Sequence, residues 1–117
     1  MIWIKFASLF MFLAVALGAF GAHALRNTLS TSMMEVYKTA NLYHFIHALG
    51  LFVIAWLSTI NSDPKIAWAG VFLIAGIILF SGSLYMLSLT GVRWLGAITP
   101  FGGLSFLAGW LLLLLTK

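Results

Sequence analysis

The sequence predicts an all-α protein, a membrane-spanning antiparallel four-helix bundle that forms a single transmembrane domain over residues 1–117. Of its 117 residues, 63% are hydrophobic and only 7% are charged, a composition outside the range of soluble domains. Four apolar runs, at about residues 3–25, 41–60, 66–89 and 94–116, each approach the ~20 residues that cross a bilayer core. Short connectors between the last three runs make neighbouring helices antiparallel, so both termini are expected on one side.

The first run has two interpretations. Lys5, an apolar stretch and Ala22-His23-Ala24 are also typical of a signal peptide with its cleavage site. The apolar stretch is longer than a usual signal core, however, and Ala14, Gly18 and Ala22 recur at the four-residue spacing that lets helices pack closely. We therefore expect this segment to be retained as the first membrane span.

The second run is predicted to extend a longer helix. Ser32-Met33-Met34-Glu35 fits a capping box, in which the serine accepts a backbone N–H and the glutamate reaches back. A helix that starts there would continue unbroken into the span. Its polar residues fall within one stripe at about 3.6 residues per turn, which must face protein or water rather than lipid. They are Tyr37, Asn41, His44, His47 and Ser58.

The fourth run contains its own start signal. Thr99 is a good N-cap, and Pro100 is tolerated at the first helical position because its missing N–H needs no partner there. In that case residues 91–98 form a shallow, irregular lead-in; otherwise Pro100 kinks a longer helix. Small residues beyond it predict a smooth face for helix packing. They are Gly102, Ser105 and Gly109.

Aromatic residues are expected at both membrane–water interfaces, where such rings prefer to lie. The alternating helix directions place one group near the termini: Trp3, Trp56, Trp68 and Trp110. They place the other group on the far side: Tyr37, Tyr43, Tyr85 and Trp94. Trp110 lies rather deep for an interfacial residue. The six Lys and Arg residues divide equally between the two sides, so the membrane orientation stays open.

The topology brings seven polar residues to the half of the membrane away from the termini. They are His23, Asn41, His44, His47, Tyr85, Arg93 and Thr99. An imidazole near hydrocarbon must find a partner or stay neutral, so this cluster is a candidate ligand site. The histidines could bind Zn or Fe, or haem through two axial imidazoles. Because no carboxylate or thiol is nearby, hydrogen-bonded packing is favoured, and no metal or cofactor is assigned.

Composition excludes several function classes. The chain has no cysteine, which excludes disulfides and thiol chemistry. Its formal charge of +4 is scattered rather than gathered into a patch, so nucleic-acid binding has no basis. It offers no carboxylate pair, no nucleophile beside a base and no phosphate-binding loop. We therefore expect no enzyme and assign no catalytic residue.

Two functions remain. The first is a small structural or accessory subunit in the lipid bilayer, which acts through helix–helix contacts as a homo-oligomer or within a larger membrane complex. The alternative is binding or transport of a small solute, proton, metal or haem at the polar cluster. Transport would need a path across the bilayer, and only Ser58 and the Ser81/Ser83 pair offer polarity towards its middle.

Four motifs, in order, resemble the YgdD-like membrane proteins, a family of unknown function. They are Gly18-Ala-Phe-Gly-Ala-His-Ala-Leu25, Tyr43-His44-x-x-His47-Ala48-Leu49, Phe80-Ser-Gly-Ser-Leu-Tyr85 and Gly96-x-x-Thr99-Pro100-x-Gly102-Gly103. The resemblance covers essentially the whole chain. It implies four transmembrane helices, an uncleaved first span and a multi-pass location in the bacterial inner membrane. It carries over no catalytic residue.

Overall fold

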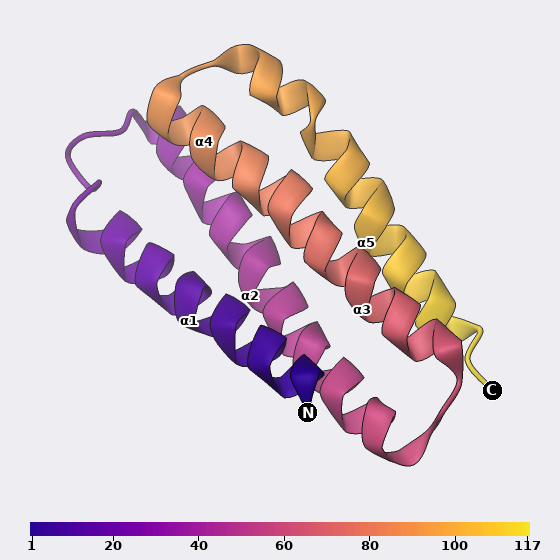
Figure 1. Ribbon diagram of the computed structural model, residues 1–117. Coiled ribbons are helices and arrows are strands. Elements are labelled where there is room, and N and C mark those ends of the chain that lie inside the picture. The colour runs from indigo at the N-terminus through magenta and orange to yellow at the C-terminus, as the bar shows by residue number, and fades with distance from the viewer.

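The computed structural model describes residues 1–117, which are helical except at the turns and the chain ends (Figure 1). Four helical stretches are long and apolar enough to cross a membrane, which confirms the predicted fold class. The third and fourth stretches are composite, because a π-helical turn and a 3₁₀ turn join their parts. The elements are α1 (Ile2–His23), α2 (Thr31–Ile60), α3 (Pro64–Gly76), the π turn η1 (Ile77–Ser81), α4 (Gly82–Thr90), the 3₁₀ turn η2 (Arg93–Ala97) and α5 (Thr99–Leu114).

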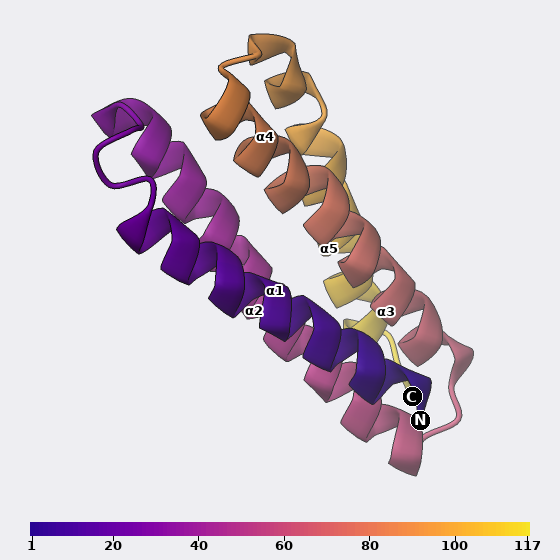
Figure 2. The ribbon, with the colours of Figure 1, turned by 60° about the vertical axis from the view of Figure 1, so that its left-hand side comes forward.

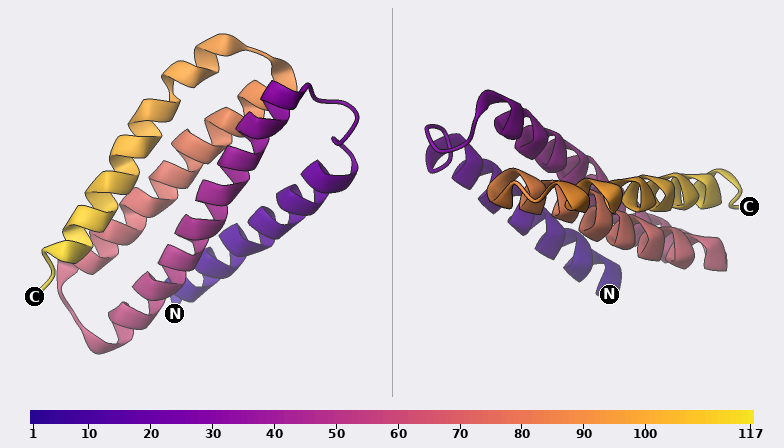
Figure 3. Two further views of the ribbon diagram at one scale, coloured as in Figure 1. Left: turned by 180° about the vertical axis from the view of Figure 1, so that it is seen from behind. Right: turned by 90° about the horizontal axis from the view of Figure 1, so that it is seen from above.

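The central helix of the bundle is α2. It packs against α1 on one side and against the α3–η1–α4 stretch on the other, and α5 packs against α3 and η1. Figures 2 and 3 show α1 beside α2, with the remaining helices grouped together and both termini at one end. The antiparallel order and the common side of the termini are therefore confirmed.

The start of α2 lies before the predicted capping box. Ser30 is the N-cap, with an extended backbone and a hydroxyl that accepts the Met33 N–H at 3.2 Å. The Ser32 hydroxyl lies 3.2 Å from that of Ser30 instead. The capping-box prediction was wrong because Ser30 has the extended backbone that a cap requires, whereas Ser32 already lies inside the helix. The unbroken helix through the span is confirmed.

The lead-in to α5 is the short 3₁₀ turn η2, and the helix itself begins at Thr99 with Pro100 in its first turn. The prediction of an irregular lead-in is therefore confirmed. Thr99 is not the cap, however, because it is already helical. Its hydroxyl lies 2.7 Å from that of Ser83 and joins α5 to α4.

The small-residue face of α5 packs closely against α3 and η1, as the sequence predicted. A Cβ added to Gly102 would lie 2.2 Å from the backbone nitrogen of Phe80 in η1, and one added to Gly109 would lie 2.9 Å from Leu73. Between them, Ser105 donates its hydroxyl proton to a backbone carbonyl of α3 at 2.7 Å. The missing side chains are what permit this helix separation.

The buried side of α1 consists of Ala7, Ala14 and Gly21, spaced seven residues apart. Gly21 faces the Tyr37 ring, and an added Cβ would lie 2.3 Å from it. Ala22 is exposed. Two residues of the expected face do pack, since Ala14 is buried and a Cβ on Gly18 would lie 2.9 Å from Asn41. The third does not: Gly21 takes the place of Ala22, because the residue opposite the tyrosine must lack a side chain.

Only some of the aromatic residues have the exposed positions expected of the predicted interfacial belts. The side chains of Trp56, Trp68 and Trp94 are 59–67% exposed on the outer surface, where interfacial rings belong. Tyr37 and Tyr85 are only 2% and 8% exposed. Their assignment to an interfacial belt was wrong, because their hydroxyls find hydrogen-bond partners inside the bundle.

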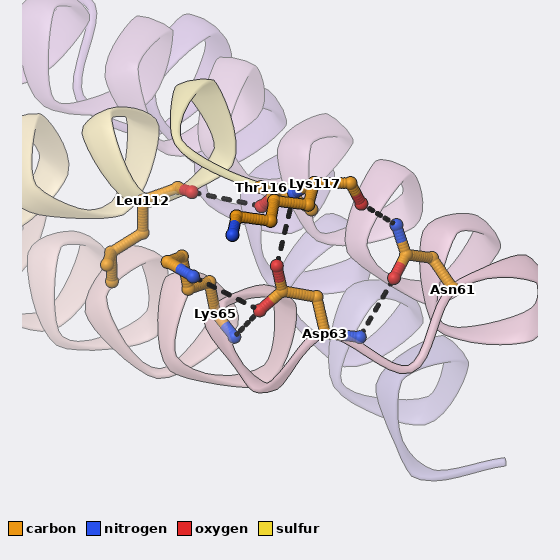
Figure 4. Close-up of polar contacts among 6 residues, drawn as sticks. All are labelled: Asn61, Asp63, Lys65, Leu112, Thr116 and Lys117. Atoms are coloured by element: carbon orange, nitrogen blue, oxygen red, sulfur yellow. Dashed lines mark hydrogen bonds and ion pairs between the residues drawn. The ribbon is translucent and has the colours of Figure 1, made fainter.

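At the end of the bundle that carries the termini, hydrogen bonds join the connector between α2 and α3 to the last residue of the chain (Figure 4). Asp63 caps α3 by accepting the Lys65 N–H at 3.0 Å, and its second oxygen accepts the Lys117 N–H at 3.1 Å. Asn61 donates to the Lys117 carbonyl at 2.8 Å. The Lys65 N–H, followed by the Lys117 N–H, holds the pKa of Asp63 below its usual value.

We predict that Gly102→Ala destabilises the protein by about 1–3 kcal/mol, the usual cost of overpacking. The added methyl group would meet the Phe80 backbone, which cannot rotate away. Gly103→Ala is the matched control, since its Cβ would find only the edge of the Phe80 ring, at 3.9 Å. Thermal unfolding in mild detergent compares the two, and equal stability would contradict the close contact.

We also predict that stability falls in acid through Asp63. Its folded-state pKa is lowered, so its stabilisation is fully present above the unfolded pKa of about 3.9 and is lost as pH falls through the lower, folded value. Asp63→Asn should flatten this part of the curve of melting temperature against pH. If the melting temperature of the variant falls at low pH as steeply as that of the wild type, a group other than Asp63 causes the loss of stability.

Candidate functional site

Polar side chains from two helices join three helices within the membrane-spanning region. The Asn41 amide of α2 donates to the Ala14 carbonyl of α1 and to the Tyr85 hydroxyl of α4, in both cases at 3.0 Å. The same hydroxyl lies 2.9 Å from Nδ1 of His44. One turn away, Tyr37 donates to a backbone carbonyl of α1. We call Asn41, His44 and Tyr85 the polar triad.

The tautomer of His44 follows from the direction of the hydrogen bond that it shares with Tyr85. The Tyr85 oxygen accepts a hydrogen bond from the Asn41 amide. We infer that the Tyr85 hydroxyl donates in turn to Nδ1 of His44, so that the neutral ring carries its hydrogen on Nε2. His44 is only 3% exposed, and this Nε2 has no partner with full hydrogen-bond geometry. The Phe10 backbone makes a weaker contact with the ring. The Ser81 hydroxyl is likewise buried and unpartnered.

His47 makes a separate contact with α5. Its Nδ1–H donates to the Tyr43 carbonyl at 2.7 Å, and its Nε2 accepts the Trp110 indole N–H at 3.0 Å. The ring also stacks on Phe106 with a centroid separation of 3.5 Å. This contact explains why Trp110 lies deep: its N–H is satisfied by an imidazole rather than by the headgroup layer.

The two histidines of α2 do not converge on one ligand. His44 faces α1 and α4, whereas His47 faces α5. No three His, Cys, Asp or Glu side chains are grouped so that they could hold a metal ion. Haem ligation by His47 Nε2 would require displacement of the Trp110 indole. This geometry argues against the metal and haem alternatives.

The remaining predicted site residues lie elsewhere. His23 ends α1 and Arg93 begins η2, and both are exposed. Thr99 bonds to Ser83. The single cluster expected from the sequence is therefore divided, because helical rotation of about 100° per residue aims α2 side chains at different neighbours. A ligand-binding role for any of these residues stays a prediction.

Two residues that make these internal hydrogen bonds were predicted from the sequence to lie at a membrane interface. Trp110 was assigned to an interface, and its unusual depth was the signal that it has an internal partner. Tyr37 was also assigned to an interface, although its helical spacing from Asn41 put it on the same stripe. Nothing in the sequence identified Gly21 as the residue opposite Tyr37.

Comparison with known proteins identifies the family. A family model described as a protein of unknown function (DUF423) matches residues 17–103. The chain belongs to the DUF423 family. It is 46% identical to the UPF0382 membrane protein SH2409 of Staphylococcus haemolyticus, over 98% of this chain and 93% of the relative. It is 48% identical to YwdK of Bacillus subtilis, over 86% of this chain and 83% of the relative.

A third relative is the UPF0382 inner membrane protein YgdD of Escherichia coli K12, which is 43% identical over 93% of this chain and 83% of its own length. The resemblance to YgdD-like proteins is therefore confirmed, and the protein is a multi-pass integral membrane protein. The family has no assigned activity. No solved structure is detectably similar to the chain.

We predict that Tyr85→Phe destabilises this DUF423 protein by about 1–2 kcal/mol, because it leaves Asn41 and His44 without their shared partner in hydrocarbon. Tyr43→Phe is the control, since the Tyr43 side chain is 39% exposed and makes no internal hydrogen bond through its hydroxyl. Unfolding in mild detergent measures both. Equal effects would show that the triad contributes no more than a lipid-facing hydroxyl.

Proposed function

We propose that the protein binds a small, apolar, ring-bearing molecule dissolved in the bilayer. The site is an open groove between α2 and α5, lined by residues of the segments 42–47 and 100–110 with Phe80 between them. We call it the α2–α5 groove. Its volume of about 820 Å³ lies within the range of about 300–1,000 Å³ that is usual for small-molecule sites. This groove is the observation that carries the proposal.

The chemistry of the groove supports an apolar ligand with a ring system. Tyr43 and Phe80 pack with ring centroids 4.5 Å apart, and Phe80 and Phe106 follow at 5.6 Å. The half-exposed Tyr43 hydroxyl is available as a polar anchor. Gly103 keeps the α5 wall open, because a Cβ there would have no neighbour closer than 3.9 Å. Apolar sites with a few polar groups are typical of ligand pockets.

A transmembrane helix is a poorer occupant of this groove. Helices in membranes associate through small residues that let their backbones approach. In this chain several such residues are covered from within: Gly21 by Tyr37, Gly70 by Trp3, and Gly76 by Phe106. The outer parts of the groove walls carry exposed leucines, such as Leu104 and Leu107. These bulky walls favour a small molecule over a packed helix.

The accessory role, as a homo-oligomer or within a larger complex, is the second candidate. The observation that favours it is the thin burial of α1, which covers only Ala7, Ala14 and Gly21. A partner helix on the outer side of α1 would add contacts that the chain itself does not provide. If the protein has only this accessory role, we expect no bound molecule in the α2–α5 groove.

Native mass spectrometry of the protein released from membranes tests the proposal. We expect a bound small molecule on the wild-type chain and its loss in Gly103→Trp, which fills the groove. Gly96→Trp is the matched control, because Gly96 also has no neighbour closer than 3.9 Å to an added Cβ but lies outside the groove. No bound molecule on the wild-type chain, or equal occupancy in both variants, would overturn the proposal. A protein partner in place of the molecule would support the accessory role.

A further inference from the structure

A second cavity lies between α1 and α2 and shares only Leu42 with the α2–α5 groove. Its volume is about 260 Å³. On the α1 side the wall is formed by Gly18, Gly21 and Ala22, and the absence of large side chains there keeps the cavity open. On the α2 side it runs from Met34, past Lys38 and Asn41, to Phe45. The cavity therefore extends from the beginning of α2 into the apolar span.

Lys38 gives this cavity an unneutralised positive charge. Its side chain is exposed and lies just before the apolar run of α2, at the level where lysines reach the headgroup layer. Glu35, one turn earlier on the same helix, does not pair with it, because the only ion pair in the structure joins Lys65 and Asp63. The ammonium group is thus free to bind an anion.

Deeper in the cavity the chemistry becomes apolar. Both protons of the Asn41 amide are used within the fold, so the amide presents only its Oδ1, beside Gly18. Leu42 and Phe45 continue the wall towards the middle of the membrane. A ligand of this cavity must therefore combine an anionic group near Lys38 with an apolar part that extends along α2.

We propose that this cavity is a binding site for an anionic phospholipid. The phosphate pairs with the Lys38 ammonium, and one acyl chain lies against Leu42 and Phe45. A free phosphate ion would satisfy the lysine but would leave the apolar wall without a partner. The cavity differs from the α2–α5 groove in the helices that form it and in its charge, because no Lys, Arg, Asp or Glu lines the groove.

The test uses the full-length protein in nanodiscs that contain phosphatidylglycerol and phosphatidylcholine in equal amounts. Native mass spectrometry after release counts the lipids that stay bound. We expect phosphatidylglycerol to be retained by the wild-type chain and retention to fall about fivefold in Lys38→Gln, as expected for the loss of one lysine near an anionic surface. Arg93→Gln is the matched control, because it removes one exposed charge at the same end but outside the cavity.

A second variant tests the cavity rather than the charge. Ala22→Phe fills the α1 wall while Lys38 remains, and Ala22 is exposed, so the helix can accept the larger side chain. We expect it to lower phosphatidylglycerol retention as well. An equal loss in Arg93→Gln and Lys38→Gln would show general charge attraction and overturn the site. Full retention in Ala22→Phe, or wild-type retention abolished by inorganic phosphate alone, would also overturn it.

Discussion

The fold depends on one constraint: polar side chains of α2 lie within the hydrocarbon layer and must find partners on other helices. Asn41 meets this need by reaching α1 and α4 at once, and His44 shares the Tyr85 hydroxyl with it. His47 does the same towards α5 through Trp110. Because an unpaired polar group is costly in lipid, these bonds fix the rotation of α2 against its neighbours.

Glycines make a second set of contacts between the helices possible. An aromatic ring can cross to the next helix only where that helix has no side chain in its way. Tyr37 lies over Gly21, Trp3 lies over Gly70, and in both pairs a Cβ on the glycine would come within 2.5 Å of the ring. Glycine is therefore used here for close approach rather than for backbone freedom. Gly91, whose φ of +71° ends α4, is the exception.

The histidine contacts and the two candidate ligand sites lie in different parts of the protein. Within the polar triad, His44 is buried in the bundle, and its Nε2 has no full hydrogen bond. The Ser81 hydroxyl of the π turn is also buried and unpartnered. The α2–α5 groove and the cavity beside Lys38 both open outward. Candidate ligand binding therefore lies on the lipid-facing surfaces of α2, not between its histidines.

The sequence by itself determined the four spans, the antiparallel order, the unbroken α2 and the packing face of α5. These follow from local properties: run length, connector length, the start signal at Pro100 and the spacing of Gly102 and Gly109. Only the tertiary structure decided which side chains meet. Residues that share a membrane half can still face different helices, because the rotation of each helix is set by packing against its neighbours. That is why His44 and His47 have different partners, and why the Trp110 indole N–H bonds to His47 rather than to the headgroup layer.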